Sequence, residues 1–107
     1  MSDFALKDLG EGRFDLSGDV SFHTAEDILG RSEKLFAGLA SVEVNLSNVE
    51  RTDSSGLALL LEWIRRATAA SNNICFANIP EKIHAIAVTA DVDDLLQRFY
   101  SSSSSKK

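Results

Sequence analysis

The order of apolar patterns along the chain predicts an α/β fold in which strands and helices alternate. Segments of period two, typical of strands, occur at residues 42–46 and 74–77, and a segment of helical period lies between them at residues 55–70. The 107 residues are enough for one domain with a real hydrophobic core, and they leave no room for a second. We expect that domain to occupy residues 1–100.

The start of the chain predicts a β-hairpin. Phe4 to Leu9 and Arg13 to Ser17 alternate weakly between apolar and polar residues on either side of Gly10-Glu11-Gly12. The second strand is expected to end in the segment Leu16-Ser17-Gly18-Asp19.

A helix and a half-buried strand come next. Thr24, with Asp27 three residues later, resembles a capping box, and the apolar residues that follow have helical spacing as far as Gly38, a residue type that favours a helix end. Residues 42–46 then alternate in a way that buries one face of a strand. This strand leads directly into the turn Asp53-Ser54-Ser55-Gly56.

That turn is the most informative feature of the sequence. Aspartate and serine are preferred helix N-caps, and glycine permits close backbone approach, so capping alone explains the carboxylate and one hydroxyl. The backbone N–H groups and the dipole at a helix start also favour an acceptor group or an added phosphate. Ser55 and Ser54 are therefore candidate phosphoacceptors, and the turn suits a switch or a docking point.

The helix after the turn has two faces when its residues are placed about 100° apart around the axis. One broad stripe should pack on the sheet: Leu57, Leu60, Leu61, Ile64, Ala67 and Thr68. The other side carries Leu59, Glu62, Trp63, Arg66 and Ala70. Tryptophan, arginine and leucine beside an exposed turn are residue types that anchor interfaces, although Trp63 could instead lean over the edge of the core. If Trp63 contacts a partner, Trp63→Ala should leave thermal stability nearly unchanged.

The last part of the chain predicts a short buried strand at residues 74–77, a helix that begins near Pro80, and one or two helical turns within residues 91–100. Residues 101–107, Ser-Ser-Ser-Ser-Ser-Lys-Lys, are polar and of low complexity, so we expect this Ser/Lys tail to be disordered.

Composition argues against a nucleic-acid or membrane-spanning protein. Eleven basic and 16 acidic residues give a net charge of −5, and no face concentrates lysine or arginine. The longest apolar run, Leu57 to Leu61, is far too short to span a bilayer, and the start of the chain has no signal segment. The expected location is the cytoplasm.

The sequence also lacks the usual signs of an enzyme. It contains no phosphate-binding glycine loop, no dinucleotide fingerprint and no nucleophile elbow. His23 and His84 lack neighbours at metal-ligand spacing, and Cys75 is expected to be a small buried hydrophobic residue. A triad of Ser55, His84 and Asp53 is a combination that most sequences with serines offer. We therefore expect no catalysis, no metal and no cofactor.

The strand end Leu16-Ser17-Gly18, the strand at residues 42–47 and the turn from Asp53 to Leu57 resemble the STAS domain family, the fold of anti-sigma factor antagonists. The resemblance covers nearly everything except the serine tail. It implies a small mixed sheet of four to five strands with helices packed on one side. In the antagonists a kinase phosphorylates the hydroxyl residue before the motif glycine, a position that corresponds to Ser55; Ser54 is its neighbour.

Residues 56–63, 76–81 and 91–96 are similar to the MlaB branch of this family, the cytoplasmic STAS subunits of the Mla ABC transporter, which moves phospholipid and maintains outer-membrane lipid asymmetry. The resemblance implies a non-catalytic protein that binds the ATPase subunit MlaF at the inner face of the inner membrane. The alternative is an antagonist that releases its partner when Ser55 is phosphorylated. The implied contact region is Asp53, Ser54, Ser55, Gly56, Leu59, Trp63 and Arg66.

Overall fold

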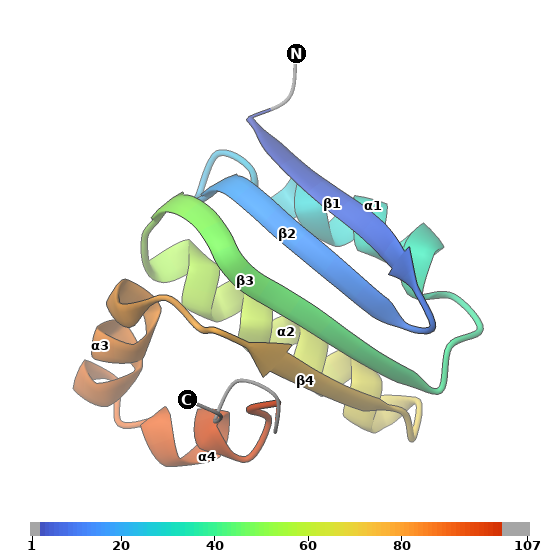
Figure 1. Ribbon diagram of the computed structural model, residues 1–107. Helices are drawn as coiled ribbons and strands as arrows, with labels where there is room; N and C mark the ends of the chain where they lie inside the picture. Colours follow the sequence, from blue (N-terminus) through green and yellow to red (C-terminus); the bar gives the residue numbers. More distant parts are fainter. Residues whose placement is uncertain (1–2, 102–107) are drawn as a thin grey trace.

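A four-stranded mixed sheet in the spatial order β1-β2-β3-β4 organises the protein (Figure 1). The computed structural model describes residues 3–101. The strands are β1 (Phe4–Gly10), β2 (Arg13–Val20), β3 (Ser41–Thr52) and β4 (Asn73–Ala77). Strand β1 is antiparallel to β2, whereas β2, β3 and β4 run parallel to one another. The predicted α/β class and mixed sheet are confirmed.

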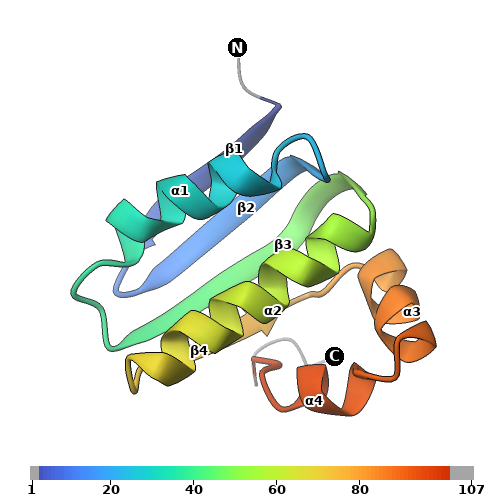
Figure 2. The ribbon, with the colours of Figure 1, turned by 180° about the vertical axis from the view of Figure 1, so that it is seen from behind.

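Two helices cover one face of this sheet. Figure 2 shows α1 lying over β1 and β2, and α2 lying beside it over β3 and β4. Two shorter helices, α3 and α4, follow β4 and lie on the β4 side of the sheet. The helices are α1 (Ala25–Phe36), α2 (Ser54–Ala69), α3 (Glu81–Thr89) and α4 (Asp93–Gln97). No helix of residues 3–101 is both long enough and apolar enough to cross a membrane.

The core lies between the sheet and helices α1 and α2. Alternate strand residues point into it, as their period predicts, and the predicted stripe of α2 contributes Leu57, Leu60 and Ile64. Thr68, also expected in that stripe, is exposed in the last turn of α2, where residues 68–70 are all exposed. Helices α3 and α4 add Ile83, Ala87 and Leu96 to the same core.

Strand β2 continues past its predicted end because Gly18 forms an irregularity within the strand. Gly18 has a φ of +89°, and the register between β2 and β3 shifts immediately after it. A Cβ atom at this position would collide with the carbonyl oxygen of Asp3. Glycine alone adopts this backbone conformation without strain, so the strand passes through it and resumes as far as Val20.

The predicted capping box at the start of α1 does not form. Thr24 precedes the helix, but its side chain makes no cap hydrogen bond to it. The Thr24 hydroxyl instead accepts a hydrogen bond from the Ser21 N–H at 3.0 Å and donates one to the Asp19 carbonyl at 2.8 Å. The hydroxyl therefore stabilises the loop between β2 and α1. Such bonds to loop backbone groups compete with helix capping for the side chain of a threonine near a helix start.

The face of the sheet away from the helices is polar. Asn45 on β3 donates to the Asp15 carboxylate on β2 at 2.9 Å, and Asn48 donates to the same carboxylate at 3.1 Å. Asn78, just after β4, donates to the Asn45 side-chain oxygen at 2.7 Å. We call this set of side chains the amide ladder: Asp15, Asn45, Asn48 and Asn78.

Cys75 also lies on this polar side, because it alternates with the buried Ile74 and Phe76 along β4. It is half-buried rather than fully buried as expected. Burial and the nearby charge of Glu43 raise the pKa of its thiol, although a hydrogen bond with Ser101 acts in the opposite direction.

The outer edge of β4 is paired with the end of the described chain. The Phe76 N–H donates to the Phe99 carbonyl and the Ser101 N–H donates to the Phe76 carbonyl, both at 2.7 Å, which forms a parallel bridge between Phe76 and Tyr100. Ser101 is buried, so the expectation of disorder from residue 101 is wrong at its first position. Residues 102–107 of the predicted tail lie outside the described residues.

Candidate functional site

The motif turn lies where two parallel strands end side by side. Val20 at the end of β2 pairs with Thr52 at the end of β3, so the loop before α1 and the turn before α2 are neighbours at the carboxyl edge of the sheet. This edge is where α/β folds commonly place their binding sites. The sequence shows the turn clearly but not its neighbour, because 31 residues separate Phe22 from Asp53.

Asp53 joins the two loops through its carboxylate. One oxygen accepts a hydrogen bond from the Ser55 N–H at 2.8 Å and caps α2, as the sequence predicts. The other oxygen accepts from the Phe22 N–H at 3.2 Å. Desolvation by itself raises the pKa of Asp53, but these two backbone N–H groups, the Ser55 hydroxyl and the charge of His23 outweigh it and hold the pKa below its usual value. The carboxylate is therefore well suited to stay charged and keep both loops in place.

The two candidate hydroxyls differ in exposure. Ser54 is exposed, whereas Ser55 is half-buried, with its hydroxyl bonded to Asp53. Both lie in the first turn of α2, where the helix dipole favours added negative charge. A phosphate on Ser55 would gain from that dipole and would be repelled by the adjacent carboxylate of Asp53.

Gly56 allows α2 to approach the sheet closely. It is buried, and a Cβ atom there would collide with the Thr52 hydroxyl and would lie 3.2 Å from Cδ1 of Ile83 and 3.4 Å from the carbonyl oxygen of Val20. The motif glycine therefore supports the turn from beneath and is not itself available to a partner.

Leu59 and Trp63 are buried, so the predicted exposed face of α2 is wrong at these two positions. Trp63 is 2% exposed and Leu59 3%. The indole Nε1–H of Trp63 donates to the Ser32 hydroxyl of α1 at 2.8 Å, and its ring lies 5.5 Å from that of Phe36. The helical wheel assumed that only the sheet packs against α2, whereas α1 covers a second side of the same helix.

Arg66 is half-exposed and lies on the α1 side of α2. It pairs with Glu62 of its own helix and with Glu33 of α1, each at 2.8 Å, and Glu62 also pairs with Arg65 at 2.7 Å. Hydrogen bonds from Arg65, the larger effect, and from Arg66 lower the pKa of Glu62 to about 2. Arg66 therefore helps to hold α1 against α2. We call this contact, together with the Trp63–Ser32 hydrogen bond, the α1–α2 seam.

An open groove lies at the turn end of this seam. It has a volume of about 620 Å³, and we call it the motif groove. Its lining residues are Phe22, His23, Ala25, Glu26, Leu29, Ser55, Ala58, Leu59 and Glu62. Leu59 thus lines the groove although very little of its surface is accessible.

Phe22 is the residue of this site that the sequence reasoning missed. Its side chain is 76% exposed, the highest value among the large hydrophobic residues in the part of the chain described, and it lies beside the Asp53 turn. The signal was an apolar aromatic residue in a polar loop directly before a helix, in the segment Ser21-Phe22-His23. Its proximity to Asp53 could not be read from the sequence, because only the parallel pairing of β2 and β3 creates it.

The imagined triad of Ser55, His84 and Asp53 is not assembled. His84 is half-exposed and its Nδ1 lies 3.2 Å from the Tyr100 hydroxyl, whereas Asp53 is bonded to Phe22 and Ser55. Within residues 3–101, no three histidine, cysteine or acidic side chains are grouped as a metal site would require.

Comparisons with known proteins agree with this architecture. Residues 6–97 match the family described as Mlab, STAS domain. The chain is 31% identical to the intermembrane phospholipid transport system binding protein MlaB of Escherichia coli K12, and equally to that of Shigella flexneri, over 72 residues. That alignment covers 67% of this chain and 72% of each relative.

Solved structures with low sequence identity share the fold. The anti-sigma factor antagonist SpoIIAA in its unphosphorylated form has a TM-score of 0.68 at 17% identity, with 92% of this chain and 85% of that chain covered. The phosphorylated form from Bacillus has a TM-score of 0.67 at 20% identity, with 92% and 88% covered.

The burial of Trp63 reverses the stability expectation for its truncation. Trp63→Ala should lower the free energy of unfolding by about 3–5 kcal/mol, because it removes a large buried ring. Ser32→Ala should cost about 1–3 kcal/mol, because it leaves the indole N–H without its acceptor. Urea denaturation measures both, with exposed Leu9→Ala as the control. A loss of stability below about 1 kcal/mol for Trp63→Ala would contradict the burial of this side chain.

Two glycine-to-alanine changes should have opposite effects on stability. Gly56→Ala should destabilise by about 1–3 kcal/mol, because its Cβ meets Thr52 and Ile83. Gly30→Ala, in the middle of α1 with nothing within 4 Å of its Cβ, should stabilise by about 0.5–1 kcal/mol. Thermal unfolding followed by circular dichroism tests the pair, and effects of the same sign would contradict the packing around Gly56.

The Glu62 ion pairs predict an acid-dependent contribution to stability. The folded state lowers the pKa of Glu62 from 4.5 to about 2, so its stabilisation is fully present above pH 4.5 and is lost as the pH falls toward 2. Wild type should therefore exceed Glu62→Gln in thermal midpoint at neutral pH, and the difference should vanish across that window. Carboxyl NMR titration gives the midpoint directly. High salt should move it upward, and a midpoint near 4.5 at low salt would show that the network is not formed.

Proposed function

Because this chain belongs to the STAS domain family, in the branch described as MlaB, we propose that it is a non-catalytic cytoplasmic subunit of an Mla-type ABC transporter. In this role it binds the ATPase subunit and supports the phospholipid transport that maintains outer-membrane lipid asymmetry. Support comes from the identity to MlaB proteins over two thirds of the chain and from a site with the character of a docking surface.

The observation that carries the proposal is the exposed Phe22 at the motif groove. Aromatic side chains are enriched among the residues that dominate binding energies, and such residues are typically surrounded by groups that exclude water. Here Leu29 and Leu59 provide an apolar floor, while His23 and Glu26 provide a polar rim. An apolar centre with a polar edge is the usual anatomy of a protein interface.

The roles of the predicted contact residues change accordingly. Asp53 holds the Phe22 loop against the start of α2. Ser55 lines the motif groove with its hydroxyl bonded to Asp53, and Ser54 is the exposed residue before it. Leu59 forms part of the floor. The remaining predicted contacts have structural roles. Gly56 and Trp63 are buried beneath the surface, and Arg66 pairs with Glu33 in the α1–α2 seam.

Truncation of Phe22 tests the proposal. Phe22→Ala should weaken binding to the purified ATPase subunit roughly 30-fold, since loss of an anchor costs roughly 2 kcal/mol or more. Thermal stability should stay within about 0.5 kcal/mol of wild type, because the side chain is exposed. Leu9→Ala is the matched control, because Leu9 is also exposed and lies in β1 next to the turn that leads to β2; this variant should bind as wild type does.

The identity of the captured protein separates the two candidate functions. Co-purification of wild type with an ATPase and its membrane complex, reduced by Phe22→Ala, supports the transporter role. The position of Ser55 at the start of α2, bonded to Asp53, favours a phosphorylation-controlled antagonist as the second candidate. Capture of a protein kinase, with phosphate added to wild type and not to Ser55→Ala, would support that role. Equal ATPase binding by wild type and Phe22→Ala would exclude the motif groove as the docking site.

A further inference from the structure

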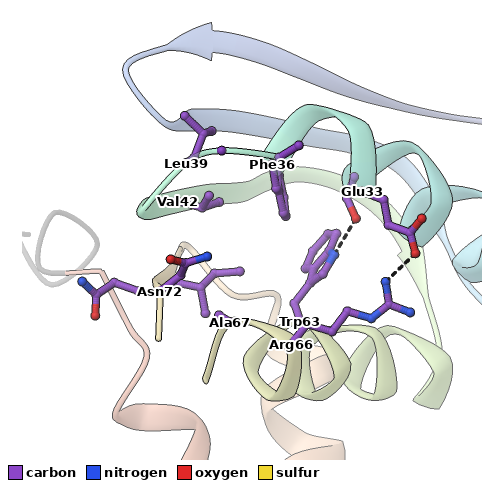
Figure 3. A pocket seen from close by; sticks show the side chains of 13 residues that line it. Glu33, Phe36, Leu39, Val42, Trp63, Arg66, Ala67 and Asn72 are labelled. Carbon is purple, nitrogen blue, oxygen red and sulfur yellow. Dashed lines mark hydrogen bonds and ion pairs between the residues drawn. The ribbon is translucent and has the colours of Figure 1, made fainter. Parts of the chain in front are cut away.

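A second concave site lies at the opposite end of the α1–α2 seam from the motif turn. It is a cavity of about 220 Å³ beneath the C-terminal ends of α1 and α2. Figure 3 shows Phe36, Leu39 and Val42 along one side, and Ala67 and Trp63 along the other. The proposed docking function does not use this cavity.

The walls of the cavity are apolar and partly aromatic. Phe36 is half-buried and lines the cavity, whereas Trp63, whose ring centroid lies 5.5 Å from that of Phe36, is only 2% exposed. Val42, Ile74 and Ala67 complete the apolar lining. The indole N–H of Trp63 already donates to Ser32, so it does not need a ligand acceptor. Aromatic rings prefer tilted or offset contacts with other rings, which these walls can offer to a further ring.

The charged groups at the cavity edge neutralise one another. The charged residues that line the cavity are Glu33 of α1 and Arg66 of α2, and they pair with each other at 2.8 Å. One cation therefore faces one carboxylate. A charged ligand would have to break this pair or enter the apolar interior without a partner, which disfavours both anions and cations.

The size of the cavity limits its ligand to a small molecule. A volume of about 220 Å³ lies below the range of about 300–1,000 Å³ that holds drug-sized ligands. It exceeds the roughly 150 Å³ of an engineered apolar cavity that binds benzene. One aromatic ring with a short substituent fits, whereas a whole phospholipid does not.

The cavity is also accessible. Ala37, Gly38, Asn72 and Asn73 line its edge and are exposed, so a small molecule can enter without separating α1 from α2. We propose that this cavity is a binding site for a small uncharged molecule built on a single aromatic ring. The proposal goes beyond the docking function and does not rest on it, because the two sites share no residue of the motif turn.

Trp63 provides the test, because it is the one tryptophan of the chain and lines the cavity. Titration with bromobenzene, whose heavy atom quenches indole fluorescence at close range, should give saturable quenching with one site and should raise the thermal midpoint. Benzoate, with the same ring and a charge, should bind at least tenfold more weakly. Quenching that never saturates, or equal affinity for benzoate, would overturn the proposal.

A matched pair of variants locates the site. Ala67→Leu fills the cavity from α2 and should weaken bromobenzene binding at least tenfold. Ala69→Leu makes the same change at an exposed position of the same helix and should leave the affinity unchanged. Methyl NMR of wild type gives a readout independent of any variant, with shifts expected at Leu39, Val42 and Ile74. Shifts confined to other residues would place the probe elsewhere and refute the assignment.

Discussion

The carboxylate of Asp53 is the interaction on which the candidate site depends. It caps α2 and holds the Phe22 loop 31 residues away in sequence, so one side chain sets the position of both sides of the motif groove. Charge-assisted hydrogen bonds of this kind are stronger than neutral ones. The same bonds keep its pKa low, so the link persists at neutral pH. A modification that draws the Ser55 hydroxyl or its N–H away from Asp53 would therefore also alter the support of Phe22.

The α1–α2 seam joins the two helices that cover the sheet and leaves a concave space at each end. Its middle is closed by the Trp63–Ser32 hydrogen bond and the Arg66–Glu33 ion pair. At one end lies the motif groove and at the other the apolar cavity. Helix α2 runs from one to the other, with Ser55, Ala58, Leu59 and Glu62 at the motif groove and Trp63, Arg66 and Ala67 at the cavity.

The strand and helix order, the N-cap at Asp53 and the helices on one side of the sheet could be predicted, because these depend on local periodicity and, for the last, on resemblance to the STAS family. The hydroxyl of Ser32 could not be assigned to Trp63, since that contact depends on how two helices pack. Exposure of Leu59 was predicted wrongly for the same reason. Thr24 shows that a local signature can also mislead when a loop competes for its hydroxyl.

The amide ladder has a consequence for how the strands find their alignment during folding. Parallel sheets are usually covered on both faces, whereas here the side away from the helices is polar. Asp15 of β2, Asn45 of β3 and Asn78 just after β4 are joined by side-chain hydrogen bonds from one strand to the next. A slip of one residue between β2 and β3 would turn these groups toward the core and break their mutual bonds. The hydrogen bonds of the amide ladder thus favour one register on the polar face of the sheet. Burial of Val44 and Leu16 on the core face favours the same register.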